Sequence, residues 1–150
     1  MTQRTPRIKA APAVTLVLIA TFVLAGCSAT DSFESELEEL ASERDSFELP
    51  PEIGDDERWQ ARLIMCPYAT QPDDVHPTLV EAASEIDTNS TDDSQWLLVR
   101  TDDRVTTLNL SRQQVDFCAP SVPNNETYGP DSSWESVEQD QTVSVTPVKH

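Results

Sequence analysis

The spacing of hydrophobic positions changes along the chain, and each change predicts an element. Residues 59–66 (WQARLIMC) begin with strict alternation, which is typical of a β-strand. One face of this strand carries Trp59, Ala61, Leu63 and Met65, and the other carries Ile64 and Cys66. Because apolar side chains occur on both faces, we expect a strand that is buried on both sides and closed by Pro67.

A helical spacing follows this strand. The apolar residues of the next segment recur three or four positions apart and form one stripe: Val75, Leu79, Ala82, Ala83 and Ile86. Asp74 is a suitable N-cap and places Pro77 in the first turn, where the missing N–H of proline costs least. The pattern predicts an amphipathic helix that packs on one face of a sheet.

Residues 95–110 predict a β-hairpin that turns at Asp102 and Asp103. With Thr101 opposite Arg104, the pairs that follow are Val99 with Thr106, Leu97 with Leu108, and Gln95 with Leu110. The four aliphatic residues of these pairs then share one face, as a half-buried hairpin requires. They are Leu97, Val99, Leu108 and Leu110.

The element order over residues 59–120 is therefore β-α-β-β. This order predicts a small two-layer α+β module with one helix on a sheet, and the helical crossover allows the first two strands to be parallel. Residues 27–58 and 121–150 on either side differ in composition from this module.

The segment before the module, residues 27–58, carries 12 acidic residues and two arginines. Asp31 could cap a helix with Glu34 three residues later, and Phe33, Leu37 and Leu40 recur at helical spacing. Because this stripe is narrow and Pro50-Pro51 ends any helix, we expect a short, weakly docked helix followed by a linker.

The segment after the module, residues 121–150, is rich in proline, serine and asparagine. Residues 141–148 (QTVSVTPV) alternate like an edge strand, but Pro147 and the polar surroundings favour a mobile or loosely docked tail. Trp134 stands out in this segment, and we expect it to tether the tail to the module; a contact with a partner is the alternative.

The first 26 residues have the parts of an export signal. Arg4, Arg7 and Lys9 form a basic start, and an apolar run of 11 residues follows over 14–24. Leu24-Ala25-Gly26-Cys27 then resembles the lipobox of bacterial lipoproteins at each position.

This resemblance implies an anchor. The Cys27 thiol would be alkylated by a diacylglyceryl group, and a peptidase would cut before Cys27, making it the first residue of the mature protein. Two acyl chains hold a protein stably on a membrane, whereas one binds reversibly. We therefore expect a lipid-anchored protein on the extracytoplasmic face of the cell membrane.

Lipid on Cys27 would leave two cysteines, Cys66 and Cys118, which are 52 residues apart. An even number of cysteines outside the cytoplasm predicts a disulfide. A redox or metal pair is the alternative, but the chain has no C-x-x-C spacing.

Charge and composition exclude several functions. The chain after residue 26 holds all 27 acidic residues and seven basic ones, so an anionic partner such as nucleic acid is not expected. His76 and the C-terminal His150 are the only histidines, and no nucleophile elbow or phosphate-binding glycine loop is present. These features predict no catalytic residues, no cofactor and no metal site.

Two functions remain open from the sequence. The first is a non-catalytic interaction module that acts on an envelope protein of unknown identity. The second is a small ligand- or divalent-cation-binding lipoprotein, because Asp87, Asn89, Thr91 and Asp93 place oxygens at alternate positions, as in a calcium loop. That resemblance is partial, since Asp92 stands where the loop needs glycine and Leu98 where it needs glutamate.

Overall fold

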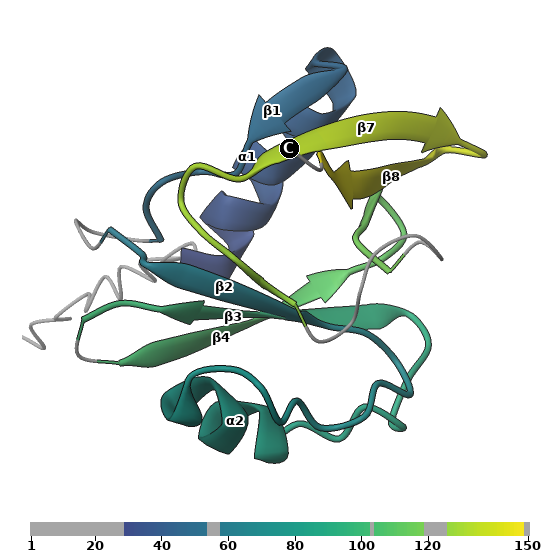
Figure 1. Ribbon diagram of the computed structural model, residues 1–150. Coiled ribbons are helices and arrows are strands. Elements are labelled where there is room, and N and C mark those ends of the chain that lie inside the picture. Colours follow the sequence, from purple (N-terminus) through teal and green to yellow (C-terminus); the bar gives the residue numbers. More distant parts are fainter. Residues whose placement is uncertain (1–28, 54–57, 103, 119–125, 149–150) are drawn as a thin grey trace, which may run out of the picture.

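Two helices and two four-stranded sheets make up the described part of the protein. The computed structural model describes residues 29–53, 58–102, 104–118 and 126–148 (Figure 1). The helices are α1 (Ala29–Glu43) and α2 (Pro77–Ser84), and the strands are β1 (Ser46–Glu48), β2 (Ala61–Met65), β3 (Ser94–Arg100), β4 (Val105–Ser111), β5 (Val115–Asp116), β6 (Thr127–Tyr128), β7 (Ser133–Gln139) and β8 (Thr142–Pro147).

The strands divide into a central sheet and a terminal sheet. The central sheet has the order β4-β3-β2-β6 and is antiparallel throughout. The terminal sheet has the order β1-β7-β8-β5, in which only the β5–β8 pair is parallel. The predicted α+β class is confirmed, but the described residues form two sheets, whereas we expected one sheet within residues 59–120.

The predicted hairpin of the central sheet is confirmed in its register. Gln95 pairs with Leu110, Leu97 with Leu108, and Val99 with Thr106. The Thr101 amide donates to the Arg104 carbonyl at 2.9 Å, as the turn requires. Alternation of apolar residues on both strands therefore determined the pairing.

The first two strands of the central sheet are antiparallel, so a parallel arrangement is wrong. The connection between β2 and β3 leaves and returns at the same end of the sheet. Its two ends lie side by side, because the Tyr68 amide donates to the Thr88 carbonyl at 3.0 Å. The eight-residue α2 is too short to carry the chain back along the sheet.

Both faces of β2 are buried, as the sequence predicts. Leu63 and Met65 point to α2, whereas Ile64 and Cys66 point to the terminal sheet. Trp59 is an exception, since it packs on the same side as Ile64 and Cys66 and not beside Leu63. The alternation fails there because β2 begins only at Ala61.

Helix α2 covers the outer face of the central sheet through the predicted stripe (Figure 1). Its N-cap is His76 and not Asp74. Pro77 occupies the first helical position, and the His76 ring nitrogen Nδ1 accepts from the Thr78 amide at 3.4 Å. An imidazole therefore replaces the expected carboxylate as the cap.

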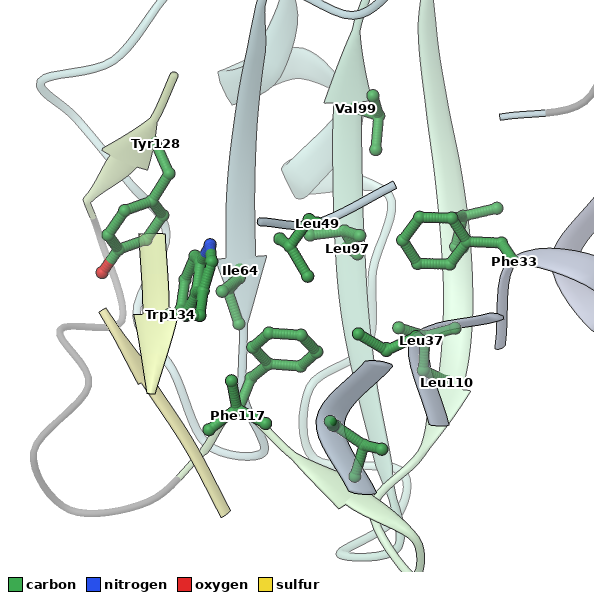
Figure 2. Packing of buried hydrophobic residues seen from close by; sticks show 14 of the residues in the cluster. Phe33, Leu37, Leu49, Ile64, Leu97, Val99, Leu110, Phe117, Tyr128 and Trp134 are labelled. Carbon is green, nitrogen blue, oxygen red and sulfur yellow. The ribbon is translucent and has the colours of Figure 1, made fainter. Parts of the chain in front are cut away.

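The main core lies between the central sheet, the terminal sheet and α1 (Figure 2). Phe33, Leu37 and Ala41 of α1 are each at most 3% exposed. The expectation of a weakly docked helix in the segment 27–58 is therefore wrong. Three residues spaced four apart are enough to dock α1 firmly, because both sheets pack against them. β1 also pairs with β7.

Residues 126–148 are part of the same core. β7 and β8 occupy the middle of the terminal sheet, so the described part of the predicted tail is not loosely docked. Trp134 does hold it in place, as expected: its side chain is 1% exposed and lies 5.3 Å from the Phe117 ring, between ring centroids. Pro147 lies at the end of β8, where a missing amide donor is tolerated.

The β7–β8 turn gives a testable consequence of this architecture. Asp140 and Gln141 both have positive φ, of 51° and 74°, in a two-residue loop that favours Asn-Gly or Asp-Gly. We expect Gln141→Gly to raise the free energy of unfolding by about 1 kcal/mol, because a left-handed backbone costs other residues about that much. Urea denaturation measures it. Gln139→Gly, one residue outside the turn, should instead destabilise; a loss at both positions would contradict the turn assignment.

Candidate functional site

A hollow lined by charged residues lies beside the C-terminal half of α1. Its volume is about 670 Å³, and it lies between α1, the start of β1 and the β7–β8 hairpin. Its ionisable lining residues are Glu38, Glu39, Glu43, Arg44, Asp45 and Glu138. We call this hollow, with its five carboxylates and one guanidinium, the acidic groove.

Backbone pairing fixes the walls of the acidic groove. The Ser136 amide on β7 donates to the Asp45 carbonyl at 3.1 Å, and its hydroxyl donates to the Arg44 carbonyl. On the other side, the Val143 amide of β8 donates to the Gln114 carbonyl at 2.7 Å. The groove is therefore held by strands on both sides and not by surface loops alone.

The end of α1 strengthens the negative potential of the groove. Unpaired carbonyls at a helix C-terminus act as a partial negative charge, which basic residues of the last turn often offset. The last turn of α1 holds no basic residue and ends in Glu43. This surface thus favours cations and repels anions.

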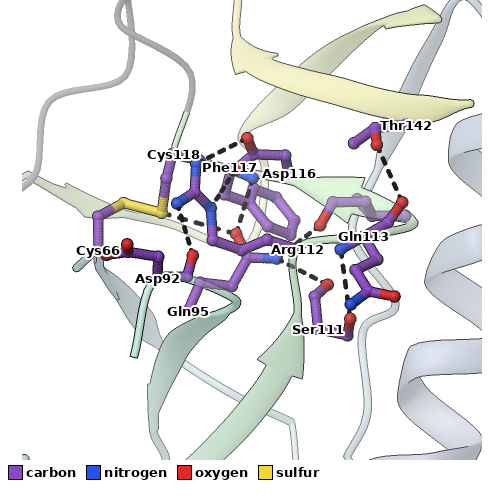
Figure 3. Close-up of polar contacts among 11 residues, drawn as sticks. Cys66, Asp92, Gln95, Ser111, Arg112, Gln113, Asp116, Phe117, Cys118 and Thr142 are labelled. Atoms are coloured by element: carbon purple, nitrogen blue, oxygen red, sulfur yellow. Dashed lines mark hydrogen bonds and ion pairs between the residues drawn. A yellow bond between two sulfur atoms is a disulfide. The ribbon is translucent and has the colours of Figure 1, made fainter. Parts of the chain in front are cut away.

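The predicted disulfide is present. Cys66 and Cys118 are bonded, with a Cα–Cα distance of 5.6 Å, and join the end of β2 to the chain after β5 (Figure 3). Gln95, which is 1% exposed, completes this junction: its amide group donates to the Val115 carbonyl at 2.6 Å and accepts from the Phe117 amide at 2.8 Å. Cys27, the predicted lipidation site, lies outside the described residues.

The calcium-like segment uses its oxygens locally. The Asp87 carboxylate accepts from the Asn89 amide at 3.1 Å, and the Thr91 hydroxyl accepts from the Asp93 amide at the same distance. These contacts close two successive turns. Among the residues that the structure describes, no three histidine, cysteine, aspartate or glutamate side chains converge as metal ligands.

Sequence reasoning missed a buried cation, Arg62 on β2. Its side chain is 0% exposed, and its guanidinium lies 3.4 Å from the Trp59 ring centroid. Nη2 donates to the Pro50 carbonyl, but Nε and Nη1 have no partner in the described part of the chain. Burial lowers the pKa of Arg62 to about 8. The signal was available, because Arg62 alternates with Ile64 and Cys66 on a buried face.

Replacing Arg62 tests how much this burial costs. We expect Arg62→Met to raise the free energy of unfolding at pH 7 by about 1–3 kcal/mol, because methionine fills similar space without a desolvated charge. The folded-state pKa is lowered, so the penalty is present below pH 8 and is relieved as the pH rises above it. In urea titrations, the difference in unfolding free energy between Arg62→Met and the parent should therefore decrease between pH 8 and 10. A variant less stable than the parent at pH 7 would show that stacking on Trp59 outweighs desolvation.

Three comparisons give no relative from which a function could be transferred. No protein-family model, curated protein or solved structure matches the chain. Within the described residues, no helix has the length and apolar character needed to cross a membrane.

Proposed function

We propose that the protein is a lipid-anchored lipoprotein of the extracytoplasmic membrane face that acts as a non-catalytic interaction module in the cell envelope. The observation that carries this proposal is Leu24-Ala25-Gly26-Cys27 at the end of an export-type signal. The Cys66–Cys118 disulfide supports it, because disulfides persist outside the reducing cytoplasm. The lipid at Cys27 would confine the module to the membrane face and raise its concentration near a partner.

The acidic groove is the surface on which we expect this partner to bind. Its charge favours a basic protein segment, since complementary charge speeds encounter and suppresses anionic competitors. Its walls belong to α1, the connection from α1 to β1, and the β7–β8 hairpin, so the surface is organised before binding. The partner would therefore lose affinity as the salt concentration rises.

A charge-variant pair tests the interaction. Chemical crosslinking in native membranes would compare the parent with Glu38→Gln/Glu39→Gln/Glu43→Gln and with a control, Asp73→Asn/Glu81→Gln/Glu85→Gln, on the opposite side of the central sheet. We expect the groove variant to lose most of a reproducible, salt-sensitive crosslink and the control to keep it. Equal crosslinking of all three proteins would reject the groove, and no reproducible crosslink would reject the interaction role.

The cation-binding alternative predicts a different result. If the acidic residues between Asp87 and Asp93 bind a divalent ion, millimolar calcium should raise the melting temperature beyond the effect of sodium chloride at equal ionic strength. We expect no such excess, because Asp87 and Thr91 already accept backbone hydrogen bonds. A calcium-specific change in tryptophan fluorescence, reported by Trp96 near this segment, would favour the alternative.

A further inference from the structure

The distance between the predicted anchor and the folded domain is very short. Helix α1 begins at Ala29, two residues after Cys27. Two residues of fully extended chain span about 7 Å. The lipid-bearing residue therefore has no spacer, although the acidic composition of residues 27–58 suggested one.

The first turns of α1 are fixed to the core. Phe33 is 2% exposed, and its ring lies 5.7 Å from the Arg62 guanidinium. One residue later, the Glu34 carboxylate accepts from the Ser111 amide of β4 at 2.8 Å. A membrane anchor on Cys27, two residues before α1, thus constrains the whole domain and not a separate helix.

We propose, resting on the lipid anchor of the proposed function, that the domain lies directly on the bilayer with the start of α1 at the lipid headgroups. The α1 carboxylates of the acidic groove, Glu38 to Glu43, lie about 14 to 21 Å along the axis of the same helix. The anchor therefore holds the groove away from its own attachment point and presents it toward the envelope space.

A matched pair of labels on α1 tests this orientation. Ser32 and Ser42 are both exposed and lie about 15 Å apart along the helix. Cys66 and Cys118 are bonded and Cys27 would carry lipid, so Ser32→Cys or Ser42→Cys supplies the one free thiol for a fluorophore. Full-length, lipidated protein would be reconstituted in phosphatidylcholine vesicles that contain a headgroup-linked nitroxide quencher. Zwitterionic lipid avoids repulsion of the acidic surface.

We expect quenching at position 32 to exceed that at position 42 at least twofold. A ten-residue Gly-Ser spacer inserted between Ser28 and Ala29 should largely abolish this difference, because such a chain spans about 17 Å on average. Equal quenching at the two positions in the parent, or an unchanged difference with the spacer, would overturn the proposed orientation while leaving the lipid anchor intact. Failure of the parent to bind vesicles would instead reject the anchor, with Cys27→Ser as the unanchored reference.

Discussion

Replacing Trp134 with alanine should lower the free energy of unfolding by about 4 kcal/mol, a large part of the stability of a domain this size. Trp134 is 1% exposed and lies on β7, where it pairs with Phe47 of β1. Its ring meets Phe117 edge-on at 5.3 Å and Tyr128 at 4.7 Å between centroids. Truncation therefore removes a contact between the two sheets and leaves a cavity at their junction.

A control on the same strand separates packing from strand formation. Val137 also lies on β7 but is 61% exposed, so Val137→Ala should cost less than about 1 kcal/mol. Urea denaturation followed by circular dichroism measures both variants. A loss below about 1.5 kcal/mol for Trp134→Ala would mean that the terminal sheet does not depend on this contact.

Removing the disulfide should have an effect of similar size. The bond closes 52 residues of chain, and the chain-entropy relation gives about 4 kcal/mol for a loop of this length. We expect Cys66→Ala/Cys118→Ala to lose about this amount. The dependence of unfolding free energy on urea should become steeper, since the unfolded chain expands when it is no longer closed.

Reduction of the parent protein is the matched control for this variant. Parent protein in dithiothreitol and the double alanine variant should have unfolding midpoints that agree closely. If reduction alone leaves the midpoint unchanged, the bond contributes little and the loss in the variant reflects packing of the alanines at Cys66, which is 4% exposed.

The parts of the fold predicted correctly are those specified by local alternation. The β3–β4 hairpin followed from four aliphatic residues that must share a face, and one register satisfies this condition. The position of α2 on the central sheet followed from its apolar stripe. Each of these elements meets a partner that is close in the sequence, so the pattern contains most of the information.

The elements predicted wrongly depend on distant partners. The buried row on α1 has only Phe33, Leu37 and Ala41 at its centre, and nothing nearby in the sequence shows that two sheets close over it. The alternating residues of β8 predicted at most an edge strand, because no apolar partner strand was evident. Its partner β7 is mostly exposed and polar, so its sequence did not indicate a strand. Long-range pairing thus determined where α1, β7 and β8 lie.

The sequence predicted the acidic character of the candidate site but not its position. Twelve of the 27 acidic residues lie in residues 27–58. The sequence alone could not bring Glu138 beside Glu39 and Glu43, since that proximity requires β7 to pair with β1. Arg62 was recognisable from alternation alone. The predicted anchor needed no folded structure, because the lipobox is a contiguous motif.

Intact-mass spectrometry of the protein extracted from membranes tests whether Cys27 is the lipidated first residue of the mature protein. We expect a chain that begins at Cys27 and carries the mass of a diacylglyceryl group on that residue, with two hydrogens lost to the Cys66–Cys118 bond. Protein that retains residues 1–26, or that begins at Cys27 with an unmodified thiol, would contradict this expectation.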